Sequence, residues 1–197
     1  MTQKKPGTLD RRAAVHELLR DRGDALIVTG LGSPTYDVFA AGDHPGNFYL
    51  WGAMGGAAMV GLGLALAQPQ RPVIVITGDG EQLMGLGALA TVVTKKPQNL
   101  TIVVLDNGHF GETGGQVSAS GLGFDLHRVT VAAGFAAVEL YELEQIAEYR
   151  PRLTTIGDGP RFVTLRIAPG NLPRALPARE GVYLQQRFRA HLGFAVE

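Results

Sequence analysis

The chain has 197 residues, with 18 basic and 18 acidic side chains and no cysteine. This length predicts one domain, and a hydrophobic content of 45% is typical of a globular protein rather than a disordered one. The net charge of zero argues against a general nucleic-acid binder, and the lack of cysteine excludes disulfides, thiolate metal sites and a cysteine nucleophile. Glycine is abundant: its 27 residues are about 14% of the chain, whereas the average share in proteins is about 7%.

We expect no targeting or membrane segment from the sequence. Residues 1–12 are charged, and no apolar segment of a signal peptide follows them. The most apolar stretch, 54–67, is shorter than the about 20 residues that cross a bilayer. We therefore expect a cytoplasmic protein that binds neither a membrane nor nucleic acid.

Helix-like and strand-like segments alternate along the chain. Amphipathic or glycine- and alanine-rich segments predict helices over 9–22, from Ser33-Pro34 onwards, and over 55–67, 82–93, 125–133, 142–153 and a short stretch near 181–192. Between them, apolar runs predict strands over 25–28, 72–77, 100–105, 136–140 and 161–167. Two segments, 42–47 and the glycine-rich 106–124, are predicted to be loops.

This alternation predicts an α/β protein with three layers, in which helices cover both faces of a mostly parallel sheet of about six strands. We expect residues 1–167 to form this domain and 168–197 to form a C-terminal extension that packs on the domain or on a partner. Ligands of such folds bind beyond the carboxyl ends of the strands, so the residues that follow strands are the candidates for function.

A Gly-Asp-Gly sequence follows the predicted strand 72–77. Gly78 and Gly80 let the backbone approach a ligand closely, and the N–H groups of a helix start suit a phosphate. Asp79 has the wrong sign for a phosphate alone, but a carboxylate beside a phosphate is favourable if Mg²⁺ lies between them. An ordinary strand-to-helix turn is the alternative interpretation.

The next central strand, 100–105, ends in Asp106-Asn107-Gly108-His109. Asn107 lies one helix and one strand beyond Asp79, so the two side chains can meet at the same edge of the sheet. An amide oxygen and a backbone carbonyl would complete a site of hard oxygen ligands. Because Asn-Gly is also a common turn pair, a simple turn is the alternative.

These motifs together resemble those of the thiamine diphosphate-dependent enzymes. Gly78-Asp79-Gly80 followed by Asp106-Asn107 looks like the diphosphate and metal motif of that family, and Leu50 to Gly55 resembles its segment that holds the aminopyrimidine ring. The stretch 27–116 resembles the small subunit of sulfopyruvate decarboxylases and the C-terminal half of phosphonopyruvate decarboxylases. The resemblance makes 1–167 a thiamine diphosphate-binding domain.

The resemblance also implies roles for individual residues. Asp79, the Asn107 side chain and the His109 carbonyl would bind Mg²⁺, Gly80 and Glu81 would offer N–H groups to the diphosphate, and Met54 would be the apolar wedge that bends the cofactor. The full set of expected cofactor contacts is Gly30, Gly32, Gly52, Ala53, Met54, Gly78, Asp79, Gly80, Glu81, Asn107, His109, Phe110 and Gly111.

What the resemblance implies for function is one subunit of a decarboxylase that acts on a small 2-oxo acid. In the family, a glutamate on a separate pyrimidine domain activates the cofactor, and nothing in the sequence matches that domain. We therefore expect a pyrimidine-domain partner of similar size in a hetero-oligomer. A carboligase or aldehyde-forming subunit, and a non-catalytic cofactor-binding module, are the alternatives.

A few residues depart from the family pattern or allow two interpretations. Glu81 occupies a position that is usually small or hydroxylated, and it would repel a diphosphate unless it points away. Glu112 either caps a helix, faces solvent, or faces the reacting carbon, and these two acids make a sulfonate- or phosphonate-bearing substrate less expected. His109 either transfers a proton or contributes only its backbone. The segment 117–124 either closes over the cofactor or is a static loop.

Overall fold

The computed structural model describes residues 7–195 and centres on one six-stranded sheet. All of its neighbouring strands pair in parallel, in the order β2-β1-β3-β4-β8-β7. The strands are β1 (Leu26–Thr29), β2 (Asn47–Tyr49), β3 (Val73–Gly78), β4 (Leu100–Asp106), β7 (Ala136–Leu140) and β8 (Arg161–Arg166). The central strands β3 and β4 are buried almost throughout, as their continuous apolar runs predict.

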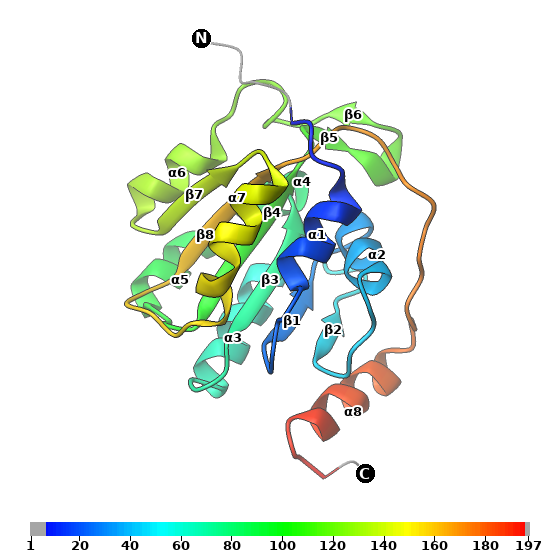
Figure 1. Cartoon of the computed structure of the whole chain (residues 1–197), viewed down its shortest axis with the longest axis vertical. Coiled ribbons are helices and arrows are strands. Elements are labelled where there is room, and N and C mark those ends of the chain that lie inside the picture. The colour runs from blue at the N-terminus through cyan, green and yellow to red at the C-terminus, as the bar shows by residue number, and fades with distance from the viewer. Residues whose placement is uncertain (1–6, 196–197) are drawn as a thin grey trace.

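Helices cover both faces of this sheet (Figure 1). Neighbouring strand residues point to opposite faces, so Ile74 packs in one core cluster and Val75 in the other. The first cluster lies under α1 (Arg11–Leu19), α2 (Ser33–Ala40) and α7 (Leu143–Tyr149), and the second lies under α3 (Ala57–Ala67), α5 (Ala88–Lys95) and α6 (Leu126–Ala133). The predicted three-layer α/β/α architecture is confirmed.

Three local predictions were wrong. The sixth strand, β2, begins at Asn47, where only a loop was expected. The single helix predicted over 82–93 is two helices, α4 (Asp79–Met84) and α5, because Gly85 lies against backbone at the junction. The predicted loop 106–124 contains a small antiparallel hairpin, β5 (His109–Phe110) and β6 (Gln116–Val117), joined through a 3-10 turn at Gly111–Thr113.

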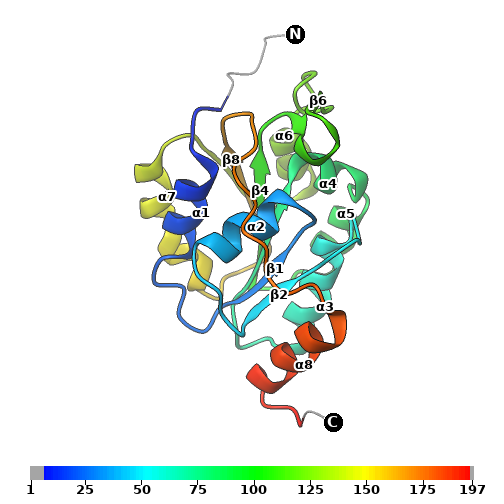
Figure 2. The ribbon, with the colours of Figure 1, turned by 90° about the vertical axis from the view of Figure 1, so that its right-hand side faces the viewer.

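The chain after β8 runs in extended form past the α1–α2 side of the molecule and ends in α8 (Gly181–His191), as Figure 2 shows. α8 packs beside β2, with the rings of Phe48 and Phe188 at 5.5 Å. Arg187 forms an ion pair with Asp43 at 2.7 Å and donates to the carbonyl of Asn47. These contacts cover the edge strand that the sequence did not reveal.

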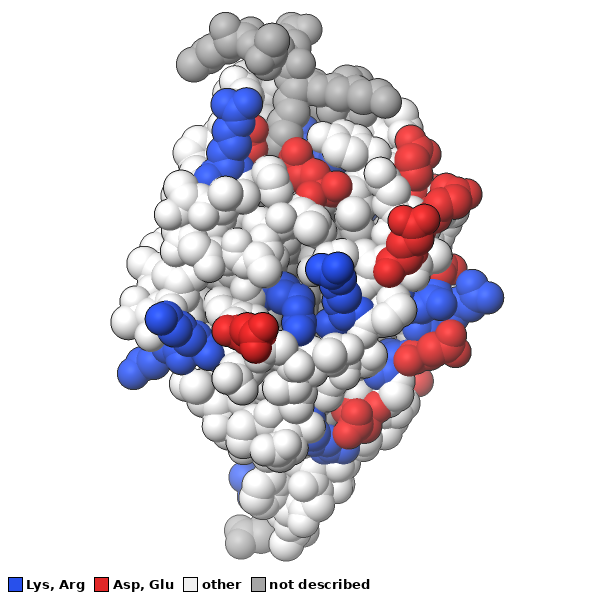
Figure 3. All heavy atoms as spheres, turned by 60° about the vertical axis from the view of Figure 1, so that its left-hand side comes forward, with Lys and Arg blue, Asp and Glu red and all other residues white. Residues whose placement is uncertain are grey.

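The surface mixes both signs of charge. On the face seen in Figure 3, basic and acidic side chains are interspersed, in keeping with the net charge of zero. Among the described residues, no helix has the length and apolar character needed to cross a membrane.

Candidate functional site

A pocket lies at the carboxyl ends of β3 and β4, where the fold places ligands. Most of the predicted cofactor residues line it, drawn from three separate segments of the chain. These lining residues are Met54, Gly78, Asp79, Gly80, Glu81, Asn107, His109, Phe110 and Gly111. Of the remaining predicted contacts, Gly30 and Gly32 lie beside side chains that line the pocket, and Gly52 and Ala53 lie in the exposed loop before Met54.

Asp79 is a buried carboxylate at the start of α4. It is 2% exposed and accepts a hydrogen bond from the hydroxyl of Ser118. Burial, followed by the nearby charge of Asp106, raises the pKa of Asp79 to about 6, although the Ser118 hydroxyl acts in the opposite direction. No basic side chain among the described residues forms an ion pair with Asp79.

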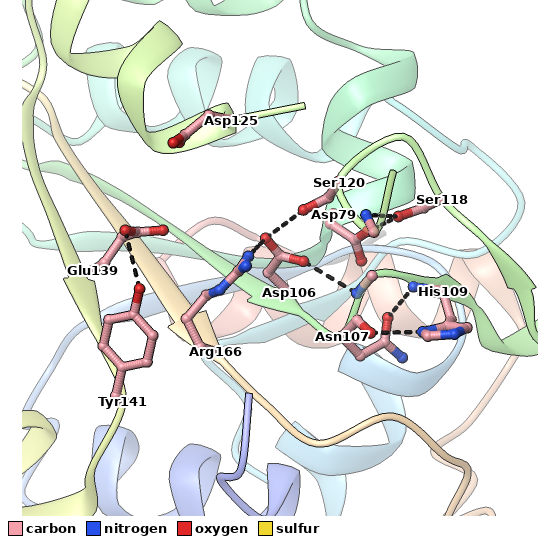
Figure 4. A network of polar contacts seen from close by, with 12 residues as sticks. Asp79, Asp106, Asn107, His109, Ser118, Ser120, Asp125, Glu139, Tyr141 and Arg166 are labelled. Carbon is pink, nitrogen blue, oxygen red and sulfur yellow. Dashed lines mark hydrogen bonds and ion pairs between the residues drawn. The ribbon is translucent and has the colours of Figure 1, made fainter. Parts of the chain in front are cut away.

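Asp106, at the end of β4, is equally buried but fully partnered. It forms an ion pair with Arg166 of β8, and it accepts hydrogen bonds from Ser120 at 2.6 Å and from the N–H of Gly108 at 3.1 Å (Figure 4). These contacts fix the turn that follows β4, so Asp106 positions the turn rather than facing the pocket.

Asn107 and His109 follow on that turn. The side-chain oxygen of Asn107 accepts a hydrogen bond from the N–H of His109 at 2.9 Å, and the His109 ring lies 2.8 Å from the Asn107 carbonyl oxygen (Figure 4). Within residues 7–195, no three His, Asp or Glu side chains gather as a metal site. A cation here would therefore need mixed ligands, such as a carboxylate, an amide oxygen, a backbone carbonyl and ligand oxygens, as suits Mg²⁺.

Glu81 lines the pocket with a side chain that is only 6% exposed. Its carboxylate accepts hydrogen bonds from the N–H of Leu31 at 2.9 Å and from the hydroxyl of Thr77 at 2.8 Å. Burial raises its pKa above the ordinary glutamate value, and its second oxygen has no hydrogen-bond partner. A Cβ on Gly30 would lie 1.8 Å from this carboxylate, which explains why only glycine fits there. Glu81 thus braces the turn after β1.

Glu112 lies at the rim of the pocket. It accepts a hydrogen bond from the Ser33 hydroxyl at 3.1 Å and forms an ion pair with Arg174 at 3.2 Å. A Cβ on Gly32 would lie 2.7 Å from the Glu112 side chain. Because its charge is paired, Glu112 opposes an anionic substrate less than the sequence suggested.

The loop before α3 lies directly on the α4–α5 junction. Met54 is 39% exposed at the pocket edge. Gly55 has a φ of +85°, and a Cβ on Gly85 would lie 2.2 Å from the carbonyl oxygen of Gly55. Backbone therefore contacts backbone between these two elements, with no side chain between them.

Several residues around the pocket were not found from the sequence. Ser118 and Ser120 are buried and bind the two carboxylates, and the N–H of Ser118 donates to the Gly108 carbonyl at 2.8 Å. The start of segment 117–124 is thus fixed by hydrogen bonds to Asp79 and Gly108. Arg166, Asn171 and Arg174 lie far away in sequence, and no local pattern marks them.

Comparison with known proteins agrees with this geometry. Residues 35–163 match the family model of the thiamine pyrophosphate enzymes, C-terminal TPP binding domain. The chain is 42% identical to phosphonopyruvate decarboxylase of Streptomyces viridochromogenes, over 91% of its own length and 45% of that protein. It is 36% identical to sulfopyruvate decarboxylase subunit beta of Methanothermobacter thermautotrophicus, covering 83% of this chain and 84% of that one.

A solved structure shares the fold. The thiamine diphosphate-dependent 4-hydroxybenzoylformate decarboxylase of Rhodococcus jostii superposes with a TM-score of 0.66 at 21% identity, over 86% of this chain and 35% of that one. The chain therefore belongs to the family of C-terminal thiamine pyrophosphate-binding domains. It spans less than half of the phosphonopyruvate decarboxylase and most of the sulfopyruvate decarboxylase beta subunit to which it is similar.

Proposed function

We propose that the chain is the cofactor-binding subunit of a thiamine diphosphate- and Mg²⁺-dependent 2-oxo acid decarboxylase, and that a separate pyrimidine-domain subunit completes its active site. The observation that carries this proposal is Asp79, a buried carboxylate without a basic partner among the described residues, in one pocket with Asn107. Both similar curated proteins named above are decarboxylases of 2-oxo acids, and one of them is a subunit.

In this proposal the pocket holds the diphosphate end of the cofactor. Asp79, the Asn107 amide oxygen and the His109 carbonyl bind Mg²⁺, whose charge balances the buried carboxylate. The N–H groups of Gly80 and Glu81, at the start of α4, would bind the diphosphate. The Glu81 side chain is no obstacle, because it is bonded to Leu31 and Thr77.

The loop before α3 holds the other end of the cofactor. The Gly52 carbonyl would hold the aminopyrimidine, and Met54 would support the cofactor from the pocket edge. When bound, thiamine diphosphate supplies an electron sink for the loss of CO₂. The work of this chain is to bind the cation and to orient both ends of the cofactor toward the partner.

An exposed apolar surface supports the need for a partner. α3 carries no charged residue, and large apolar side chains around it remain exposed: Met54, Met59, Val60, Leu66 and Met84. Such a patch beside a binding pocket is typical of an interaction surface. The larger phosphonopyruvate decarboxylase, of which this chain covers 45%, has room for a further domain in the same polypeptide.

The experiment is a reconstitution. The chain alone is expected to release almost no CO₂ from a panel of 2-oxo acids that includes phosphonopyruvate and sulfopyruvate, and addition of the partner subunit restores release. Product analysis with and without an aldehyde acceptor distinguishes decarboxylation from carboligation. Full activity of the isolated chain would overturn the two-subunit proposal.

The cation role is tested by binding. Thiamine diphosphate is titrated with Mg²⁺ in the presence of the partner, first with the natural chain and then with Asp79→Ala. We expect the affinity to fall by at least about a hundredfold, because a metal ligand and its charge are both lost. Unchanged affinity would refute the metal assignment.

A further inference from the structure

The extended segment after β8 contacts both loops that the proposed function assigns to the cofactor. We call residues 171–179 the tail strap. It lies between the end of β8 and α8 and runs past α2 (Figure 2). Most of its residues are exposed, so its own burial does not account for its path.

The first contact is with the turn after β5. The side-chain amide of Asn171 donates a hydrogen bond to the Gly111 carbonyl at 2.9 Å. A Cβ on Gly111 would lie 2.6 Å from the Asn171 oxygen, so the two residues are in close contact. Asn171 therefore fixes the backbone of the pocket wall at Gly111.

The second contact is with the pocket rim. Arg174 pairs with Glu112 at 3.2 Å, and its guanidinium lies 5.9 Å from the ring centre of Tyr36 in α2. Since Glu112 also accepts from Ser33, Arg174 ties the turn to the start of α2. The strap thereby links two elements that both line the pocket.

The third contact is with the loop that leads to Met54. The indole N–H of Trp51 donates to the Ala178 carbonyl at 3.0 Å, and Arg179 lies over the Trp51 ring at 5.5 Å. Trp51 directly precedes Gly52, so this contact restrains the loop proposed to hold the aminopyrimidine.

Both ends of the strap are anchored. Before it, the N–H of Ile167 donates to the Asp106 carbonyl and that of Ala168 donates to the Leu9 carbonyl. After it, α8 is held at β2 by Arg187. A segment fixed at both ends can restrain the exposed loops that it touches, which have few buried contacts of their own.

We propose that the tail strap is a positioning element of the cofactor site, in which Asn171 and Arg174 hold the Gly111–Glu112 wall and Ala178 holds the Gly52–Met54 loop. This inference rests on the proposed function for the identity of the ligand. The contacts themselves do not, which allows the two ideas to be tested separately.

The first test needs no cofactor. Hydrogen exchange is measured on the full chain carrying Asn171→Ala together with Arg174→Met, with Arg128→Met as the control, because Arg128 is an exposed arginine paired with Asp125 on α6. We expect amide exchange at residues 111–114 to rise about tenfold in the double variant, as the loss of one hydrogen bond and one surface ion pair predicts. The control should leave these amides unchanged. Unchanged exchange in the double variant would overturn the proposal.

A second readout uses the single tryptophan of the chain. In a further variant, residues 171–179 are replaced by a flexible linker of equal length, while α8 keeps its own contacts. We expect the fluorescence emission of Trp51 to shift to longer wavelength and its quenching by acrylamide to increase. An unchanged spectrum would contradict the contact with Ala178.

The last test measures thiamine diphosphate binding with Mg²⁺ in the assembled complex. The double variant should bind about tenfold more weakly, and Arg174→Lys with Asn171 intact should recover most of the affinity because the charge is retained. Equal affinity of the double variant and the natural protein would refute the positioning role. If no protein, natural or altered, binds the cofactor, the proposed function fails while the exchange result still stands.

Discussion

The neighbouring strands β3 and β4 each lead to a buried aspartate at the same edge of the sheet, Asp79 and Asp106. The two aspartates differ in their partners. Asp106 has a cation, a hydroxyl and a backbone N–H as partners. Asp79 has the Ser118 hydroxyl but no basic side chain among the described residues, and its pKa is raised to about 6. A buried charge is stable only when it is paired, and among the described residues only Asp106 has a basic side chain as its partner.

The largest effect should come from removing the counter-ion of Asp106. In Arg166→Met the buried Asp106 loses its counter-ion, and we expect the free energy of unfolding to fall by about 3–5 kcal/mol. Urea denaturation measures this, with Arg128→Met as a surface control that should cost less than about 1 kcal/mol. A similar small loss for both variants would mean that Asp106 does not depend on Arg166.

The second prediction concerns Asp79 and the pH dependence of the free energy of unfolding. Because the folded pKa of Asp79 is near 6 and the ordinary value is 3.8, the folded chain binds the proton more tightly than the unfolded chain. Its contribution to stability is therefore complete below about pH 4 and is lost as the pH rises to about 6, by roughly 3 kcal/mol.

Asp79→Asn isolates that contribution. Without divalent cations, the variant should match the natural chain near pH 4 and be more stable above pH 6, and the difference is read from denaturant midpoints across the pH range. A constant difference between the two chains from pH 4 to pH 7 would show that Asp79 does not titrate in this range.

The smallest expected losses of stability come from removing the hydroxyls of Ser118 and Ser120, one at a time. Ser118→Ala removes a donor from a carboxylate without a basic partner, so we expect a loss of about 2 kcal/mol at pH 7. Ser120→Ala should cost about 1 kcal/mol, because Asp106 keeps Arg166 and the Gly108 N–H. The two variants are each other's control in thermal unfolding, and equal losses would remove the distinction between the two aspartates.

The sequence predicted most of the fold because its signals are local. Runs such as Val73 to Thr77 alternate with helical segments, and that pattern specifies a parallel sheet. β2 escaped prediction because it has three residues and owes its place to β1 on one side and α8 on the other. The split between α4 and α5 depends on a contact between Gly85 and Gly55, which no local pattern encodes.

The candidate site divides in the same way. Asp79 and Asn107 were found because each follows a strand, and topology brings strand ends together. Ser118 and Arg166 were missed, since a serine in a glycine-rich loop and an arginine at the end of a strand resemble many others until the chain is folded. Whether the pocket residues bind the cofactor as proposed stays a prediction.

Because the backbones of Gly55 and Gly85 are in contact, we expect the loop before α3 and the α4–α5 junction to move together. A side chain between them would absorb a small displacement by changing rotamer, whereas two backbones in contact transmit it. Met84, next to this junction, is 68% exposed, and Met54 stands at the other end of the linkage. A displacement of the α4–α5 junction at Met84 would thus be passed on to the loop that carries Met54, at the edge of the pocket.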